Sequence, residues 1–139
     1  MASNVLVFKS SASLGLGDEL LDSLENALPR KCKLEIYDTM RDLVRRLRQP
    51  RDGLDIAVLF VASKDELIQI HLIRDLFAGM RLILILPDQR SETLSAGLVF
   101  RPRFMTYVDQ NLSEVASVVR KMLAPPRPAR TMSGKPGKR

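Results

Sequence analysis

Cysteine and histidine are almost absent from this sequence, which contains one of each among its 139 residues. Cys32 has no second cysteine with which to form an internal disulfide, so we expect a plain structural thiol. His71 alone provides little for a histidine triad or for a metal site built from several histidines. It falls on the polar side of its predicted helix, where we expect an ordinary surface residue. These scarcities predict neither a metal nor a cofactor.

Long hydrophobic runs are missing as well. No segment approaches the roughly 20 apolar residues of a membrane-spanning helix. Hydrophobic residues make up 45% of the chain and charged residues 27%, which is typical of a globular domain in water. Strand-like sequence begins at Asn4 and leaves no room for a signal peptide. We therefore expect a cytoplasmic protein that does not bind a membrane.

Motifs for catalysis are also lacking. Asp52, Asp55 and Asp88 fall on a loop, a strand start and a turn, with no spacing that pairs them for acid–base chemistry. The glycines of the loop Ser10 to Gly17 match neither the GxGxxG motif nor a phosphate-binding P-loop. Backbone N–H groups of such a loop can cradle a phosphate, but a flexible connection between strand and helix is the favoured interpretation. We therefore do not expect an enzyme.

The net charge of +6 is concentrated at the end of the chain. Residues 124–139 hold 5 of the 22 Lys and Arg residues and no acid, so residues 1–123 carry 17 basic and 16 acidic residues. The terminal segment is rich in Pro and Gly and poor in apolar residues, which predicts a basic flexible tail. Residues 1–123 are long enough for one domain with its own core.

Two continuous apolar runs organise the rest of the sequence. Residues 54–61 and 82–86 are each long enough for a strand, and runs without alternation are typical of strands covered on both faces. Residues 64–77 are long enough for the crossover helix that parallel strands require. That helix has more apolar residues than one sheet contact needs, so its excess apolar surface is a candidate interface. These residues are Leu67, Ile68, Ile70, Leu72, Ile73, Leu76 and Phe77.

The remaining segments continue the alternation of strand and helix. Further strands are predicted at residues 4–8, 33–37 and 104–108, and further helices at 18–28, 40–47, 91–99 and from 111 or 113 to 123. Five strands alternating with five helices predict a three-layer α/β domain with a parallel five-stranded sheet. The flavodoxin-like strand order 2-1-3-4-5 puts residues 54–61 in the middle and the half-polar residues 33–37 at an edge.

The predicted second helix carries a basic face. Arg41, Arg45 and Arg48 recur at helical spacing, with Arg46 and Arg51 nearby. Such a face can meet an acidic partner or, weakly, nucleic acid. It lacks aromatic stacking groups and a known recognition motif, so a solvated basic face is the commoner explanation.

The order of elements over residues 4–123 resembles the receiver domain of bacterial two-component response regulators. Residues 43–60 are similar to the second helix, turn and third strand of that family, with Asp55 at the acid that often begins the strand. Residues 106–110 resemble the end of its fifth strand, with Tyr107 at the position of the switch aromatic. The resemblance implies the CheY-like (βα)5 fold.

The acidic site of that family is missing at the matching positions. Phe60 stands where the phosphoacceptor aspartate is expected, and Lys9 and Ser10 replace the acidic pair that would hold magnesium. Pro87 lies near the expected Ser or Thr, and Gln110 replaces the expected lysine. The resemblance therefore implies a degenerate receiver that cannot be phosphorylated.

Without that chemistry, the resemblance implies a regulatory or protein-interaction module in bacterial signalling, which binds a protein partner or itself. Receivers commonly make contacts through the fourth helix, fifth strand and fifth helix, so Arg101, Arg103 and Tyr107 are candidate contact residues. An equally good explanation is that Tyr107 packs at a strand end and that both arginines are solvated. Two alternatives remain: a small phosphate-bearing ligand at the loop Ser10 to Gly17, bound or turned over, and weak nucleic-acid association through the basic helix and tail.

Overall fold

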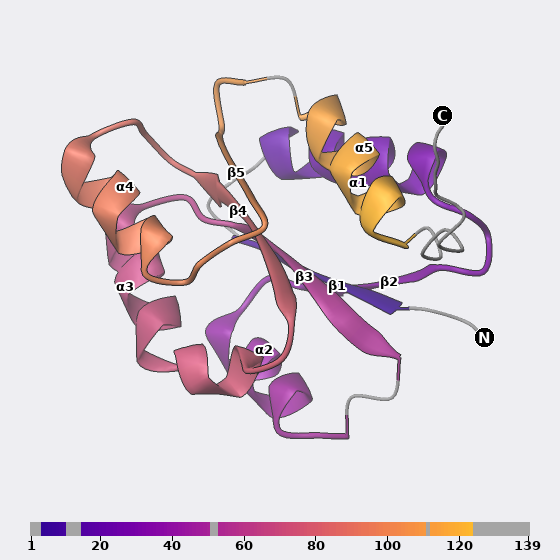
Figure 1. Ribbon diagram of the computed structural model, residues 1–139, viewed down its shortest axis with the longest axis horizontal. Coiled ribbons are helices and arrows are strands. Elements are labelled where there is room, and N and C mark those ends of the chain that lie inside the picture. Colours follow the sequence, from indigo (N-terminus) through magenta and orange to yellow (C-terminus); the bar gives the residue numbers. More distant parts are fainter. Residues whose placement is uncertain (1–3, 11–14, 51–52, 111, 124–139) are drawn as a thin grey trace, which may run out of the picture.

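Five parallel strands form one sheet in the order β2-β1-β3-β4-β5 (Figure 1). The computed structural model describes residues 4–10, 15–50, 53–110 and 112–123. The observed order confirms the predicted flavodoxin-like topology, with β3 in the centre and β2 at an edge. The strands are β1 (Asn4–Lys9), β2 (Lys33–Tyr37), β3 (Leu54–Phe60), β4 (Arg81–Leu86) and β5 (Phe104–Tyr107).

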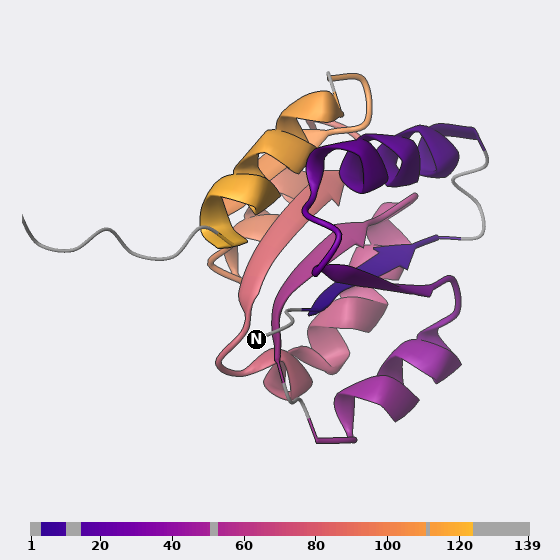
Figure 2. The same ribbon diagram turned by 90° about the vertical axis from the view of Figure 1, so that its right-hand side faces the viewer.

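Helices cover both faces of the sheet and complete the predicted three layers. One face is covered by α1 and α5, and the other by α2, α3 and α4 (Figure 2). The helices are α1 (Gly15–Ala27), α2 (Met40–Leu47), α3 (Lys64–Leu72), α4 (Ser91–Leu98) and α5 (Ser113–Leu123), with a short 3-10 helix η2 (Arg74–Phe77) before β4. Among the described residues, no helix has both the length and the apolar character needed to cross a membrane.

Side chains of β3 alternate between two separate cores. Ala57 and Leu59 pack on the side of α2, α3 and α4, whereas Ile56 and Val58 pack beneath α1 and α5. A strand covered on both sides must be apolar on both sides, which explains the continuous apolar run in the sequence. This arrangement was predicted from the run itself.

The segment between β3 and β4 differs from the prediction of one continuous helix over residues 64–77. The α-helix ends at Leu72, and Ile73 has φ −109° and ψ 18°, outside the helical region. The Ile73 N–H donates to the Ile70 carbonyl at 3.0 Å, an i to i−3 bond that begins the tighter 3-10 turn. The turn buries Phe77. The apolar pattern continues across this break, so hydrophobic spacing alone did not reveal it.

Excess apolar surface, predicted for this crossover segment, is present on α3. Leu67 and Ile70 are fully buried, but 45% of Ile68 and 79% of Leu72 is exposed. Large apolar side chains exposed on neighbouring turns are typical of a contact surface.

Two side-chain contacts join α3 to α4 and to the residues that follow α4. Lys64 Nζ lies 2.6 Å from Glu92 Oε2, in an exposed ion pair that contributes little to stability. The His71 ring meets the Phe100 ring edge-on, with centroids 5.7 Å apart. His71 is therefore half-buried against an aromatic ring, rather than the ordinary surface residue that its place on the helical wheel predicted.

The edge strand β2 is tied to its neighbours through Glu35. This carboxylate accepts hydrogen bonds from Asn4 Nδ2 of β1 at 2.8 Å and from the Tyr37 hydroxyl at 3.1 Å. Arg46 of α2 adds a two-point contact through Nε and Nη2. The Arg46 hydrogen bond, together with those from Asn4 and Tyr37, holds the pKa of Glu35 below its ordinary value of 4.5, against the opposing effect of burial.

Substitution Glu35→Gln is expected to lower the free energy of unfolding by about 1–3 kcal/mol near neutral pH, because it removes the charged partner of Arg46. A carboxyl whose pKa is lowered in the folded state stabilises that state above its ordinary value of 4.5, and this contribution is lost as pH falls through the lowered value. The difference between wild type and Glu35→Gln should therefore shrink in acid, measured by urea unfolding over a pH series. Glu114→Gln, at an exposed acid of α5, is the control and should change stability little at any pH. A difference for Glu35→Gln that is unchanged in acid would contradict the assignment.

Candidate functional site

The predicted site positions lie together at the carboxyl-terminal ends of the strands, which form one edge of the sheet that is distinct from its edge strand β2. Lys9 pairs with Phe60 at the ends of β1 and β3, and the Ser10 N–H donates to the Phe60 carbonyl at 3.2 Å. Pro87 and Gln110 follow β4 and β5 at the same edge, since Leu86 and Tyr107 are register partners. Parallel strands place all their carboxyl ends together, which is where ligands bind in this architecture.

Phe60, at the position of the expected phosphoacceptor, is part of the core. Only 1% of this residue is exposed, and its side chain packs in the cluster beneath α1 and α5 with Val58 and Ile85. A buried phenyl ring has neither a nucleophilic atom nor a ligand for a cation. The residue at the end of the central strand therefore contributes to the hydrophobic core, at the position where a receiver domain would have its phosphoacceptor.

A carboxylate that was not among the predicted site residues occupies this edge. Glu66 Oε2 accepts a hydrogen bond of 2.6 Å from the Ser10 hydroxyl, and its Oε1 accepts one of 2.9 Å from the Ala62 N–H. Ser10 is 1% exposed, so its hydroxyl needs a partner inside the protein. Glu66 thus joins the end of β1 to the turn that follows β3.

Local sequence explains how Glu66 reaches the sheet edge. Ser63 is the N-cap of α3, and its side chain accepts the Glu66 N–H at 3.2 Å. A serine followed three residues later by a glutamate is the capping-box pattern, in which the glutamate turns back toward the start of its helix. This pattern at residues 63–66 was the available signal for Glu66.

Lys9 and Gln110 have partners close in sequence. Lys9 Nζ lies 3.2 Å from Asp18 Oδ1 of α1, in an exposed pair. Gln110 Nε2 lies 3.4 Å from Asp109 Oδ1. Within residues 4–10, 15–50, 53–110 and 112–123, no group of three His, Cys, Asp or Glu residues is arranged to hold a metal ion. The candidate phosphate loop falls largely on residues 11–14, which lie outside the described part of the chain.

The candidate contact residues near β5 do not form one group. Arg101 and Arg103 are exposed before the start of β5, whereas Tyr107 ends that strand. The strand Phe104–Tyr107 separates them by about 10 Å at the usual rise per residue. Tyr107 is half-buried and packs against the core on the side of α2, α3 and α4.

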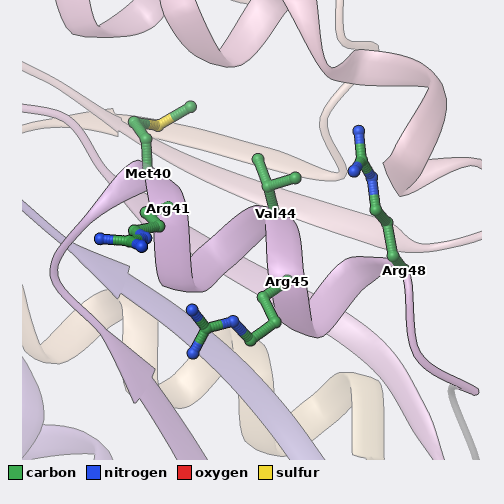
Figure 3. Close-up of a pocket in the computed structure, with 5 residues that line it drawn as sticks. All are labelled: Met40, Arg41, Val44, Arg45 and Arg48. Atoms are coloured by element: carbon green, nitrogen blue, oxygen red, sulfur yellow. The ribbon is translucent and has the colours of Figure 1, made fainter.

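Two arginines of α2 and the arginine at its C-cap line one surface, as the helical spacing predicted. Arg41, Arg45 and Arg48 line an open groove of about 560 Å³ together with Met40 and Val44 (Figure 3). The neighbouring Arg46 does not join this basic face, because its guanidinium binds Glu35 and also donates to the Pro50 carbonyl. Arg46 therefore lies near the basic face, but its charge is paired with Glu35.

Two other expectations about the basic region lie outside the described residues. They concern Arg51, at residues 51–52, and the tail 124–139.

Comparison with known proteins supports the fold through solved structures. No protein-family model matches the sequence, and no curated protein matches it either. Among solved structures, a response regulator from Thermotoga maritima has a TM-score of 0.65 at 15% identity, over 88% of this chain and 98% of that one. A CheY-like receiver domain protein from Methanospirillum hungatei gives 0.62 at 14% identity, over 88% of this chain and 94% of that one.

A third solved structure with the same fold is not described as a response regulator. The chain is similar to a putative pilus assembly-related protein from Burkholderia pseudomallei, with a TM-score of 0.61 at 17% identity, over 87% of this chain and 88% of that one. All three matches span nearly the whole described domain. The chain therefore has the receiver-like fold of response regulators.

Proposed function

We propose that this chain is a non-phosphorylatable, receiver-like regulatory module that acts in bacterial signalling by binding a protein partner or a second copy of itself. The observation that carries the proposal is the burial of Phe60 in the core, where a phosphoryl acceptor would need an accessible oxygen or nitrogen. The hydrogen bonds of Glu66 support it, because they already use the Ser10 hydroxyl and the Ala62 N–H at the carboxyl ends of β1 and β3.

Exposed apolar side chains provide the basis for partner binding. Ile68 and Leu72 on α3, and Leu98 and Val99 at the end of α4, are each at least 45% exposed. The helices that carry them pack side by side, so much of this surface can meet one partner. Arg101 and Arg103 follow directly after α4 and would supply charged contacts at its border. Tyr107 remains a separate candidate contact at the far end of β5.

Solved structures of this fold agree with a regulatory role but do not name a partner. Two are described as response regulators or their receiver domains, and two as putative pilus assembly proteins. A protein-interaction module with this fold is compatible with both signalling and pilus assembly.

Treatment with acetyl phosphate and Mg²⁺ tests the proposal. We expect no stoichiometric gain of a phosphoryl group by intact-mass spectrometry, because the acceptor position is a phenyl ring. A receiver domain with its aspartate intact, treated in parallel, verifies that the donor is active. One acid-stable or hydroxylamine-labile phosphoryl group per chain would overturn the non-phosphorylatable assignment.

A further inference from the structure

One face of the domain is acidic because of α1. Asp18, Asp22 and Glu25 are exposed and recur at intervals of four and three residues, which places them on one side of the helix. Residues 15–27 contain no Lys or Arg. Leu21 lies between these acids in sequence, but its side chain packs against the core beneath α1 and α5. The outer surface of α1 thus presents three carboxylates, of which Asp18 already forms an exposed ion pair with Lys9.

The opposite face is basic because of α2. Arg41, Arg45 and Arg48 repeat the intervals of four and three residues, and Figure 3 places Met40 and Val44 beside them along the groove. Arg45 has only a long, exposed contact of 3.8 Å with Asp42. The guanidinium groups of Arg41 and Arg48 have neither an ion pair nor a hydrogen bond with any residue that the structure describes. All five lining residues belong to α2 or its C-cap, so the groove is a shallow, open surface of one helix that presents cations beside Met40 and Val44.

The acidic and basic rows match in spacing as well as in charge. Side by side in the same direction, the pairs would be Asp18 with Arg41, Asp22 with Arg45 and Glu25 with Arg48. In opposite directions Asp22 still meets Arg45, because each lies at the centre of its row. Asp22 and Arg45 are accordingly the central pair in either orientation.

These two helices cannot meet within one copy, since α1 and α2 lie on opposite faces of the sheet (Figure 2). We propose that the domain associates with itself head to tail, with α1 of one copy docked in the α2 groove of the next. Such an interface joins two different surfaces, so each added copy leaves one α1 and one α2 free. The expected products are open chains or closed rings rather than a twofold dimer. The inference does not depend on the function proposed above, because it uses neither the strand-end site nor the α3–α4 surface.

Composition of the groove favours a protein helix over nucleic acid. Single-stranded nucleic acid is held by stacking on aromatic rings, and the groove residues include none. Residues 1–123 contain 17 basic and 16 acidic residues, so the net charge of +6 that opposes association of the full chain lies mainly in residues 124–139. Two short helices bury less than a standard interface, so we expect weak association with a dissociation constant on the order of 100 µM at low salt.

Sedimentation velocity of the full chain tests the association. The weight-average sedimentation coefficient should rise between about 10 µM and about 1 mM protein at low salt, and the rise should be much smaller at about 0.3 M NaCl, where screening shortens the reach of exposed charges. Arg45→Glu or Asp22→Arg should each weaken association by about tenfold or more, because each places like charges at the central contact. Arg120→Glu changes an exposed arginine of α5 by the same charge and should leave association unchanged.

Mixing the two variants gives the decisive measurement. Alone, each of Asp22→Arg and Arg45→Glu should associate about tenfold or more weakly than wild type. An equimolar mixture should recover association close to the wild-type level, and so should the double variant Asp22→Arg/Arg45→Glu. Loss of folding cannot produce this rescue. The proposal is overturned if the wild-type chain stays monomeric at about 1 mM, if the single reversals have no more effect than Arg120→Glu, or if the mixture fails to associate. Tighter binding of a DNA duplex than of a second copy, lost in Arg45→Glu, would instead assign the groove to nucleic acid.

Discussion

Replacing Phe60 by aspartate should lower the free energy of unfolding by about 3–5 kcal/mol and should not create a phosphoacceptor. The phenyl ring is 1% exposed and packs beneath α1 and α5. Aspartate would leave a cavity there and would bring a charge to the edge of an apolar core. We expect urea unfolding to give this loss and acetyl phosphate with Mg²⁺ to give no phosphorylated protein.

Phe60→Leu separates the two causes of that loss. Leucine keeps most of the apolar volume, so this control should cost no more than about 1.5 kcal/mol. A Phe60→Asp protein as stable as wild type would mean that the position tolerates an acid, and uptake of one phosphoryl group would mean that the receiver chemistry can be restored by one substitution. Either result would contradict the conclusion that the main role of Phe60 is to pack in the hydrophobic core.

Removing the Glu66 carboxylate is the second substitution with a large expected effect. Glu66→Ala should lower the free energy of unfolding by about 2–4 kcal/mol, because it leaves the buried Ser10 hydroxyl and the Ala62 N–H without their shared acceptor. Glu66→Gln keeps the shape and one acceptor oxygen, so its cost should be smaller. Asp65→Ala removes an exposed acid from the same helical turn and should change stability by no more than about 0.5 kcal/mol.

A double-mutant cycle with Ser10→Ala tests the contact itself. Two groups joined by a hydrogen bond of 2.6 Å should show a coupling energy of about 1–3 kcal/mol, measured from the unfolding of the two single variants and the double variant. Additive effects of Ser10→Ala and Glu66→Ala would show that the two side chains do not stabilise each other.

Patterns in the sequence were sufficient to predict the fold, because the apolar and polar composition of each segment indicates how the segment is buried. The continuous apolar runs of β3 and β4 require cover on both faces, and the alternation in β2 requires an edge, so little freedom remained for the strand order. The break at Ile73 was missed because the apolar spacing continues from α3 into η2, and only the backbone angles separate the two.

Side-chain partners at the candidate site were harder to predict, since they depend on contacts between distant segments. Ser10 and Glu66 are 56 residues apart in sequence, and nothing near Ser10 indicates its partner. The partner of Arg46 could not be read from the spacing of the arginines, because Glu35 lies on a neighbouring strand. The arginine row itself was predictable, because residues of one helix share a face by spacing alone.

Glu66 also has a consequence for how this edge of the sheet responds to its surroundings. The carboxylate belongs to the chain, so its effective concentration beside Ser10 and Ala62 is set by the length of a short helical turn and does not change with dilution. A dissolved anion competes poorly with a tethered one, and the occupancy of this edge should be insensitive to the supply of metabolites.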